Sequence, residues 1–186
     1  QATDYYNRMS ANGLYEEYTN EKRLRGPVIA AQSVADFFPD NRSDKLILDL
    51  HRLGFPKLHA LDPSEGMLHV ARQKNVYEKL YCCYLDQNRL PIDDDVYDCA
   101  ASSGGFGEGH IPVAGLHELA RIVKPGGLVS IVMREMYLET VQEYRGRLEP
   151  VMAEMQTAGK WRQLSRKVVS KYYFDDNGVV FEFVVC

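Results

Sequence analysis

Two acidic residues follow short apolar runs early in the 186-residue sequence, at positions suited to binding a ligand. Asp49 comes after LIL, and Asp62 comes after KLHAL. Apolar runs that end on an acid are typical of the first two strands of a doubly wound α/β unit, where the second acid accepts hydrogen bonds from ribose hydroxyls. The alternative for Asp62 is a structural role, because Asp62 or Ser64 can cap a following helix. We expect Asp62 to bind a ligand that carries a ribose.

The connection between these two runs is too short to contain a helix. Only six residues, 51–56, separate LILDL from KLHALD. A crossover between parallel strands normally takes about a dozen residues or more, because the chain must return along the strand and cover the sheet. Six residues span the distance at roughly 3.3 Å each but leave no length for a helix. We predict adjacent parallel strands over residues 46–50 and 57–61, with a break in the chain near Leu50 or His51.

Helix-like and strand-like segments alternate along the next part of the chain. The periodicity of apolar residues predicts helices over 27–38, 64–75 and 113–123. Short apolar runs predict further strands at LYCCYLD, VYDCAASS and LVSIVMR, with a glycine-rich turn over residues 104–109. This alternation predicts a doubly wound, mostly parallel α/β sheet with helices on both faces. We expect one domain over residues 1–186, in which residues 1–26 form an N-terminal cap.

The C-terminal part has a different pattern. Residues 137–159 are helical in periodicity, and Pro150 predicts either a kink or the start of a second helix. Two apolar runs follow, WRQLSRKVVSKYYF and VVFEFVVC, and Asp-Asp-Asn-Gly joins them. Because Asn-Gly between apolar runs is the strongest short hairpin signal, we predict a C-terminal antiparallel hairpin that turns at this dipeptide.

Composition excludes several classes of partner and location. A net charge of −4 and a pI near 5.8 provide no basic face, so we expect no nucleic acid partner. No apolar run approaches the roughly 20 residues of a membrane span, and the first residues show no signal pattern, which predicts a cytoplasmic or nuclear protein without a membrane partner. The four cysteines make no Cys-x-x-Cys pair, and we expect them to be reduced core residues.

Three longer segments resemble the class I S-adenosylmethionine-dependent methyltransferases. They are LHELARIVKPGGLVSIVMR, LDPSEGML and LDQNRLPIDDDVYDCAASS, and the resemblance extends from about Tyr15 to the end of the chain. It implies a Rossmann-like sheet with a C-terminal antiparallel hairpin. It also implies an enzyme that uses S-adenosylmethionine to methylate a small molecule or a protein.

The resemblance suggests roles for residues at the strand ends. It places Met67 against the adenine of the cofactor, although a thioether at this position also serves as a core filler. Asp86 and Gln87 lie where the third strand ends, and the family places an acid there to receive the adenine amino group; the alternative is an exposed turn. Ser102, followed by Ser103, ends the fourth strand beneath the transferred methyl group, where both hydroxyls can equally satisfy local backbone groups.

Further positions match the family in the N-terminal cap and in the glycine-rich turn. Tyr15 and Arg25 match cap residues that close over the cofactor, and Arg25 can pair with the cofactor carboxylate. A solvated helix face explains both residues equally well. His110 follows Gly-Glu-Gly near the expected reaction centre and is a candidate base, although an isolated loop histidine is more often incidental. No catalytic residue is assigned, because alignment of the acceptor with an activated methyl group supplies most of the catalysis.

One signature of the family is missing. The loop D-x-G-x-G-x-G should follow the first strand, but Asp49 and Leu50 run directly into a segment, residues 51–55, that resembles the end of the next helix. We interpret this as about a dozen residues that the protein contains but that are absent from this sequence because they are disordered. A crossover needs that length, and a glycine-rich segment without its ligand is a natural candidate for disorder. The alternative is a true deletion, which would leave one sheet face uncovered and remove cofactor binding.

Other motifs narrow the acceptor and define rival functions. The fourth strand lacks the Asn/Asp-Pro-Pro-Tyr/Phe motif of enzymes that methylate adenine or glutamine. The acidic run over residues 93–95 is typical of a solvated turn, and no metal site is expected. The first rival is a non-catalytic relative that has lost the glycine loop. The second is a nicotinamide-dependent oxidoreductase, because an acid after the second strand serves either ribose.

Overall fold

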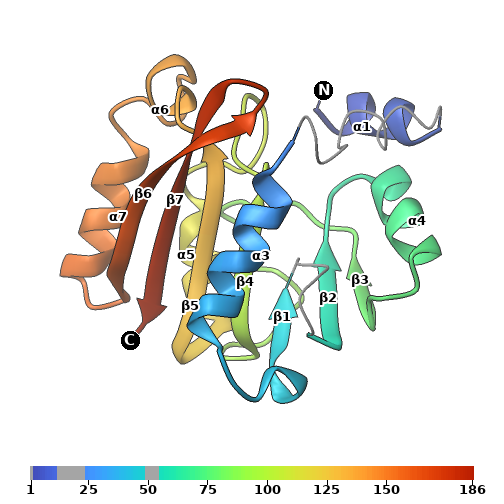
Figure 1. The fold of residues 1–186 in the computed structure, drawn as a ribbon, viewed down its shortest axis with the longest axis horizontal. Coiled ribbons are helices and arrows are strands. Elements are labelled where there is room, and N and C mark those ends of the chain that lie inside the picture. Colours follow the sequence, from blue (N-terminus) through green and yellow to red (C-terminus); the bar gives the residue numbers. More distant parts are fainter. Residues whose placement is uncertain (1, 12–23, 49–54) are drawn as a thin grey trace.

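The computed structural model describes residues 2–11, 24–48 and 55–186, and a seven-stranded sheet forms its centre (Figure 1). The strand order is β3-β2-β1-β4-β5-β7-β6. Among these strands, β7 alone runs in the opposite direction to the other six. The sheet therefore has the mostly parallel, doubly wound layout that the alternating pattern predicts. The strands are β1 (Leu46–Leu48), β2 (Lys57–Leu61), β3 (Lys79–Tyr81), β4 (Tyr97–Ser103), β5 (Val123–Arg134), β6 (Trp161–Tyr173) and β7 (Asp176–Val185).

The first two strands pair as predicted. Leu46 lies opposite Lys57, and Leu48 lies opposite His59, in parallel register. This pairing confirms the prediction of adjacent parallel strands over LIL and KLHAL. The predicted break near Leu50 or His51 lies outside the described residues, as does Asp49.

Helices cover both faces of the sheet. On one face, α3 packs small side chains, Ala30, Ala31 and Ala35, against residues of β1, β4 and β5, so the helix approaches the sheet closely. Figure 1 shows α3 crossing in front of β5. On the other face, α5 and α7 bury leucine, isoleucine and methionine side chains. The described helices are α1 (Ala2–Ala11), α3 (Gly26–Phe37), α4 (Glu65–Gln73), α5 (Gly115–Ile122), α6 (Tyr137–Thr140) and α7 (Leu148–Thr157), with a 3₁₀ turn at Arg42–Asp44.

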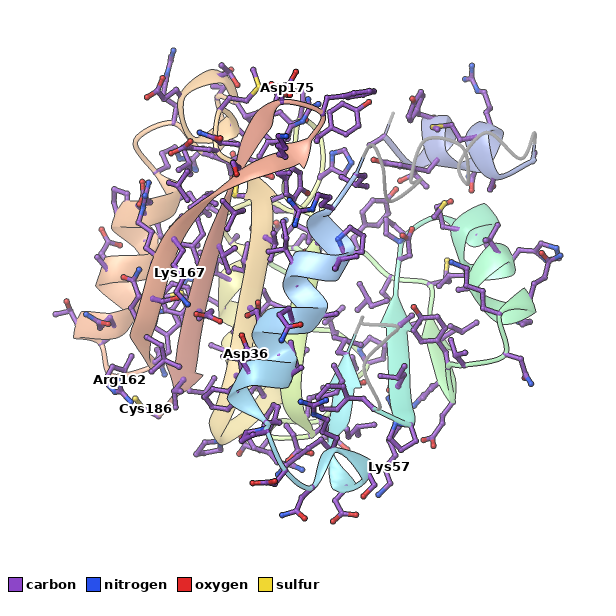
Figure 2. All side chains as sticks on the ribbon, viewed as in Figure 1. Asp36, Lys57, Arg162, Lys167, Asp175 and Cys186 are labelled. Carbon is purple, nitrogen blue, oxygen red and sulfur yellow. The ribbon has the colours of Figure 1, made fainter. Side chains whose placement is uncertain are left out.

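The C-terminal hairpin forms, but its turn is not at Asn-Gly. Tyr173 pairs with Asp176, so Phe174 and Asp175 make the connection, and Phe174 takes a φ of 49°. Figure 2 shows Asp175 at one end of the hairpin and Cys186 at the other. Gly178 instead lies within β7, where a Cβ atom would come within 2.7 Å of the Tyr172 ring. The prediction of the turn was wrong, because the packing of this ring requires the glycine inside the strand.

The third strand and the cysteines also differ from expectation. The strand begins at Lys79 and ends at Tyr81, so Cys82 and Cys83 follow it. Cys82 and Cys186 are exposed, Cys83 is half-buried and only Cys99 is buried. The expectation of four core cysteines was therefore wrong, because the apolar run LYCCYL continues past the point where the backbone leaves the sheet.

The carboxyl ends of the parallel strands meet the N-terminal helix. Lys57, at the start of β2, lies at the opposite end of the sheet from α1 (Figures 1 and 2). Helix α1 packs along α4 beyond the end of β2. No helix in the described part of the chain is long and apolar enough to cross a membrane.

Candidate active site

A cavity of about 480 Å³ lies at the carboxyl ends of β2 and β4. Its walls come from the ends of these strands, the first residues of α4, the glycine-rich turn after β4 and the N-terminal helix α1. Ligand cavities in α/β proteins have this position and about 300–1,000 Å³ of volume. The cavity is therefore the candidate active site.

Asp62 lies in this cavity, directly after β2. Its Oδ1 atom accepts a hydrogen bond of 2.7 Å from the backbone amide of Ser64. No partner for Oδ2 is found among residues 2–11, 24–48 and 55–186. Burial raises the pKa of the Asp62 carboxyl, and the Ser64 amide and the nearby His110 oppose this shift. One carboxylate oxygen thus maintains the turn into α4, while the other is available to a ligand.

Ser64 joins the start of α4 to α1. Its hydroxyl caps α4 by accepting from the Met67 amide at 3.1 Å, and it donates to the side-chain oxygen of Asn7 at 2.6 Å. The same Asn7 oxygen accepts from the Gly66 amide at 3.0 Å. The side chain of Asn7 therefore holds α1 against the turn that carries Asp62.

The residues predicted to contact an adenine lie in two adjoining cavities. Met67 lines the main cavity, and Asp86 lines both the main cavity and a second one of about 380 Å³. Both carboxylate oxygens of Asp86 accept hydrogen bonds from Asn88, through its amide at 2.7 Å and its side chain at 3.1 Å. Gln87 is exposed and lines only the second cavity. Met67 and Asp86 thus share the cavity of Asp62, and Gln87 lies beside it.

The floor of the cavity is the end of β4. Ser102 and Ser103 both line it, and Gly104, with a φ of 76°, turns the chain away from the sheet. The Ser103 hydroxyl is buried and makes no aligned hydrogen bond within the described chain. The phenol of Tyr172 lies beside it, close enough for Ser103 to lower the phenol pKa, although burial has the larger effect and raises the pKa of Tyr172 to about 12. A buried hydroxyl that makes no hydrogen bond within the described protein is suited to form one with a polar group of a ligand.

The hydroxyl of Tyr144 stabilises the glycine-rich turn after β4 through hydrogen bonds. Its buried hydroxyl accepts from the Gly107 amide at 2.9 Å and lies 2.7 Å from the Ile111 carbonyl and 3.0 Å from the Gly107 carbonyl. A phenol has one proton to donate, so the shorter contact to Ile111 is the main donated bond. Burial raises the pKa of Tyr144 and keeps this proton in place. The turn that carries His110 is therefore fixed by one side chain.

His110 faces the cavity and contacts α1. Its Nδ1 atom is 2.8 Å from the carbonyl oxygen of Glu108, and its Nε2 atom is 3.0 Å from the hydroxyl of Tyr6. Gly109, with a φ of 70°, bends the chain immediately before it. The structure thus brings the candidate base to the cavity that contains Asp62.

The structure places Arg25 outside the main cavity. Arg25 is exposed; its backbone amide donates a hydrogen bond of 2.9 Å to the Tyr172 carbonyl, and its own carbonyl accepts one of 2.9 Å from the Ile29 amide. Tyr15 and Asp49 lie outside the described residues. The roles predicted for Arg25, Tyr15 and Asp49 stay predictions.

Several residues of the site were not predicted from the sequence. Tyr6 and Asn7 belong to α1, Tyr144 precedes α7, and Tyr172 belongs to β6, all far in sequence from the strand ends that they meet. The abundance of tyrosine near the N-terminus was the only signal for any of them. Among the described residues, no group of three or more histidine, cysteine or acidic side chains could hold a metal ion.

Comparisons with known proteins fit this architecture. A family described as "Methyltransferase domain" matches residues 42–131. Human methyltransferase-like protein 27 is 29% identical over 175 residues, which cover 88% of this chain and 69% of that protein.

Two solved structures share the fold. Burkholderia thailandensis 1,6-didemethyltoxoflavin-N1-methyltransferase, solved with 1,6-didemethyltoxoflavin and S-adenosylhomocysteine, superposes with a TM-score of 0.66 at 13% identity, over 99% of this chain and 87% of that one. A chain from the complex of the Haloferax volcanii Trm112 methyltransferase activator with a methyltransferase gives a TM-score of 0.68 at 16% identity, over 97% of each chain. The chain therefore has the fold of these methyltransferase structures, and its sequence is similar to the methyltransferase domain family over residues 42–131 and to the human relative.

Proposed function

We propose that this chain binds S-adenosylmethionine in the 480 Å³ cavity and transfers its methyl group to an acceptor bound beside it. The observation that carries this proposal is the half-buried Asp62, whose Oδ2 atom has no partner in the described chain at the carboxyl end of β2. A carboxylate in this position can accept from both hydroxyls of a ribose. The family match supports the choice of cofactor.

The residues of the cavity fit the parts of this cofactor. Asp62 would hold the ribose, Met67 would pack on the adenine ring, and Asp86, with lone pairs left on both oxygens, would receive the adenine amino group. Ser103 and the turn at Gly104 would lie under the methionine part, where a buried hydroxyl lacks a partner in the described structure. When bound, S-adenosylmethionine supplies a methyl group that is already activated toward a nucleophile.

The work of the protein is then to align the acceptor and to exclude water. Helix α1 closes the cavity through Ala2, Thr3 and Tyr6, and the side chain of Asn7 fixes this helix to α4. Alignment of two reactants in a closed site can supply a large part of the rate enhancement.

The strand order supports this proposal over a nicotinamide-dependent oxidoreductase. The last three strands run β5-β7-β6, with β7 antiparallel to both neighbours, as the methyltransferase layout requires. The usual dinucleotide-binding sheet continues instead in the order 3-2-1-4-5-6. The non-catalytic relative, which has lost the glycine-rich loop after Asp49, is distinguished by experiment.

Calorimetric titration of the full-length protein with S-adenosylhomocysteine and, separately, with NAD tests the proposal. We expect S-adenosylhomocysteine to bind and NAD not to bind. The Asp62→Asn variant should weaken S-adenosylhomocysteine binding about 10- to 100-fold, the scale of hydrogen bonds to a charged group. The matched control Asp93→Asn changes an exposed loop carboxylate and should bind like the original protein. Binding of NAD alone would support the oxidoreductase, and binding of neither ligand would support the non-binding relative.

A further inference from the structure

The hydrogen bonds of His110 define which of its nitrogens carries the proton. The Glu108 carbonyl can only accept, so Nδ1, at 2.8 Å, must be the N–H donor. In the neutral ring Nε2 then has a lone pair, and the Tyr6 hydroxyl, at 3.0 Å, donates to it. The basic nitrogen of His110 therefore points away from its own loop and toward α1.

The space around this nitrogen is lined by aromatic rings. Tyr6, Tyr137 and Tyr172 all line the cavity. Burial raises the pKa of Tyr6 and of Tyr172, and in both cases the Tyr137 phenol adds to the rise. The Arg134 side chain closes this end, with its guanidinium 4.1 Å from the centre of the Tyr173 ring. Walls of this type favour a small planar ring, because aromatic rings stack or meet edge to face.

We propose that this end of the cavity is the acceptor subsite, that it takes a small aromatic hydroxyl compound of the phenol class, and that His110 accepts the hydroxyl proton. The inference depends on the proposed function, because the methyl donor must occupy the Asp62 end of the same cavity. A neutral hydroxyl is a weak nucleophile, so removal of its proton during attack accelerates transfer. Nε2 of His110 has a lone pair and lies at this subsite, so it can accept the hydroxyl proton.

The transfer balances in atoms and charge. The acceptor oxygen forms a bond to the methyl carbon, and the bond between that carbon and the sulfonium sulfur breaks. The hydroxyl proton moves to Nε2 of His110, directly or through the Tyr6 hydroxyl, which can donate to Nε2 while it accepts from the acceptor. The products are an aryl methyl ether, neutral S-adenosylhomocysteine and an imidazolium. One positive charge is present before and after the step.

Charged and polar groups surround His110. The Asp62 carboxylate is close enough to interact with it, and the Glu108 carbonyl accepts from its Nδ1–H in either protonation state. Arg134 also lines the main cavity and is paired with Asp176 at 3.3 Å, which offsets its charge. Among the described residues, the titratable side chains that line the two cavities with His110 or contact it include Tyr6, Asp62, Tyr84, Asp86, Arg134, Tyr137, Glu143, Tyr144 and Tyr172.

The test uses 4-nitrophenol, whose phenolate absorbs visible light, added to the full-length protein saturated with S-adenosylhomocysteine. We expect the probe to bind and its phenol pKa to fall by about one unit or more against the free probe, because an imidazolium beside the oxygen favours the charged form. His110→Gln can still accept from Tyr6 but cannot be protonated, and it should abolish the shift while S-adenosylhomocysteine affinity changes less than about twofold. His117→Gln, the same change at an exposed position of α5, should behave like the original protein.

A second measurement needs no variant. In ¹H–¹⁵N spectra of the imidazole rings at constant pH, addition of the probe should convert one histidine from the Nδ1–H form to the doubly protonated form. The inference is overturned if the loaded protein does not bind 4-nitrophenol, if the bound phenol keeps its ordinary pKa, or if His110→Gln retains the shift. Failure of S-adenosylhomocysteine to bind in calorimetry would instead remove the proposed function, so the two failures are distinguishable.

Discussion

The hydroxyl of Ser64 donates a hydrogen bond of 2.6 Å to the side-chain oxygen of Asn7, 57 positions away in the sequence. Because Ser64 also caps α4, this one hydroxyl joins the N-terminal helix to the turn that presents Asp62. The position of α1 over the cavity is thus coupled to the local structure of the proposed ribose site.

Replacement of Asn7 by alanine should loosen α1. The change removes the acceptor of two hydrogen bonds, from Ser64 and from the Gly66 amide, which together contribute about 1–2 kcal/mol to docking of the helix. Hydrogen exchange followed by mass spectrometry should show faster exchange over residues 2–11, with β5 unchanged. Arg8→Ala, an exposed change on the same helix, serves as control and should leave exchange as it was. Equal exchange in Asn7→Ala and the original protein would contradict the coupling.

Asp62→Asn should increase stability at neutral pH while it weakens ligand binding. Burial raises the folded-state pKa of Asp62 above its ordinary 3.8, so the folded protein binds this proton more tightly than the unfolded chain. Stability from this group therefore rises as the pH falls through the folded pKa, and the charged carboxylate costs stability above it. Denaturant unfolding at pH 7 should show the variant to be more stable, and the difference should shrink toward pH 4. A variant that is less stable at pH 7 without ligand would refute this assignment.

Tyr144→Phe should destabilise the glycine-rich turn after β4. The ring stays in place, but the Gly107 amide loses its acceptor in a buried position, a loss of about 1–3 kcal/mol. We expect lower thermal stability and faster amide exchange over residues 105–111. Tyr5→Phe removes a phenol oxygen from an exposed residue of α1 and should change neither quantity. If both variants behave alike, the turn does not depend on this hydroxyl.

Glu118→Gln should destabilise the segment that follows Asp86. Glu118 receives two hydrogen bonds from Arg121, at 2.7 and 2.6 Å, and one of 2.8 Å from the buried amide of Leu90. The amide side chain keeps one acceptor but loses the charge, with an expected cost of about 1.5–3 kcal/mol. The hydrogen bond from Arg121 is the main cause of the lowered pKa of Glu118, so the carboxylate adds stability above its unfolded pKa and loses it as the pH falls through the folded one.

Chemical denaturation at pH 7 and at pH 4 measures this effect. The difference between Glu118→Gln and the original protein should be largest at pH 7 and smaller at pH 4. Glu154→Gln, an exposed change on α7, should lie within about 0.5 kcal/mol of the original at both values. A similar cost for the two variants would show that the buried pair contributes nothing beyond an exposed carboxylate.

Most of the sheet was predictable because local sequence carries the information. Apolar runs that end on Asp49, Asp62 and Asp86 predicted strands, and helical periodicity predicted α3, α4 and α5. The helix cap at Ser64 could also be predicted from local sequence, since a hydroxyl just before a helix accepts a hydrogen bond from the backbone amide three residues later. The hairpin was predictable as an element, but its turn was not, because Gly178 is required by the ring of Tyr172 rather than by the turn.

The sequence by itself predicted the order of the strands and six of the cavity residues, since each lies at or after a strand end or opens a helix, and strand ends converge at one edge of a parallel sheet. These residues are Asp62, Met67, Asp86, Ser102, Ser103 and His110. Only the tertiary structure decided that Tyr6 meets His110, 104 positions away, and that Tyr144 holds the turn between them. It also placed Gln87 and Arg25 outside the main cavity. Such contacts depend on where separate elements dock, and docking is set by the packing of whole faces, which no local pattern of residues specifies.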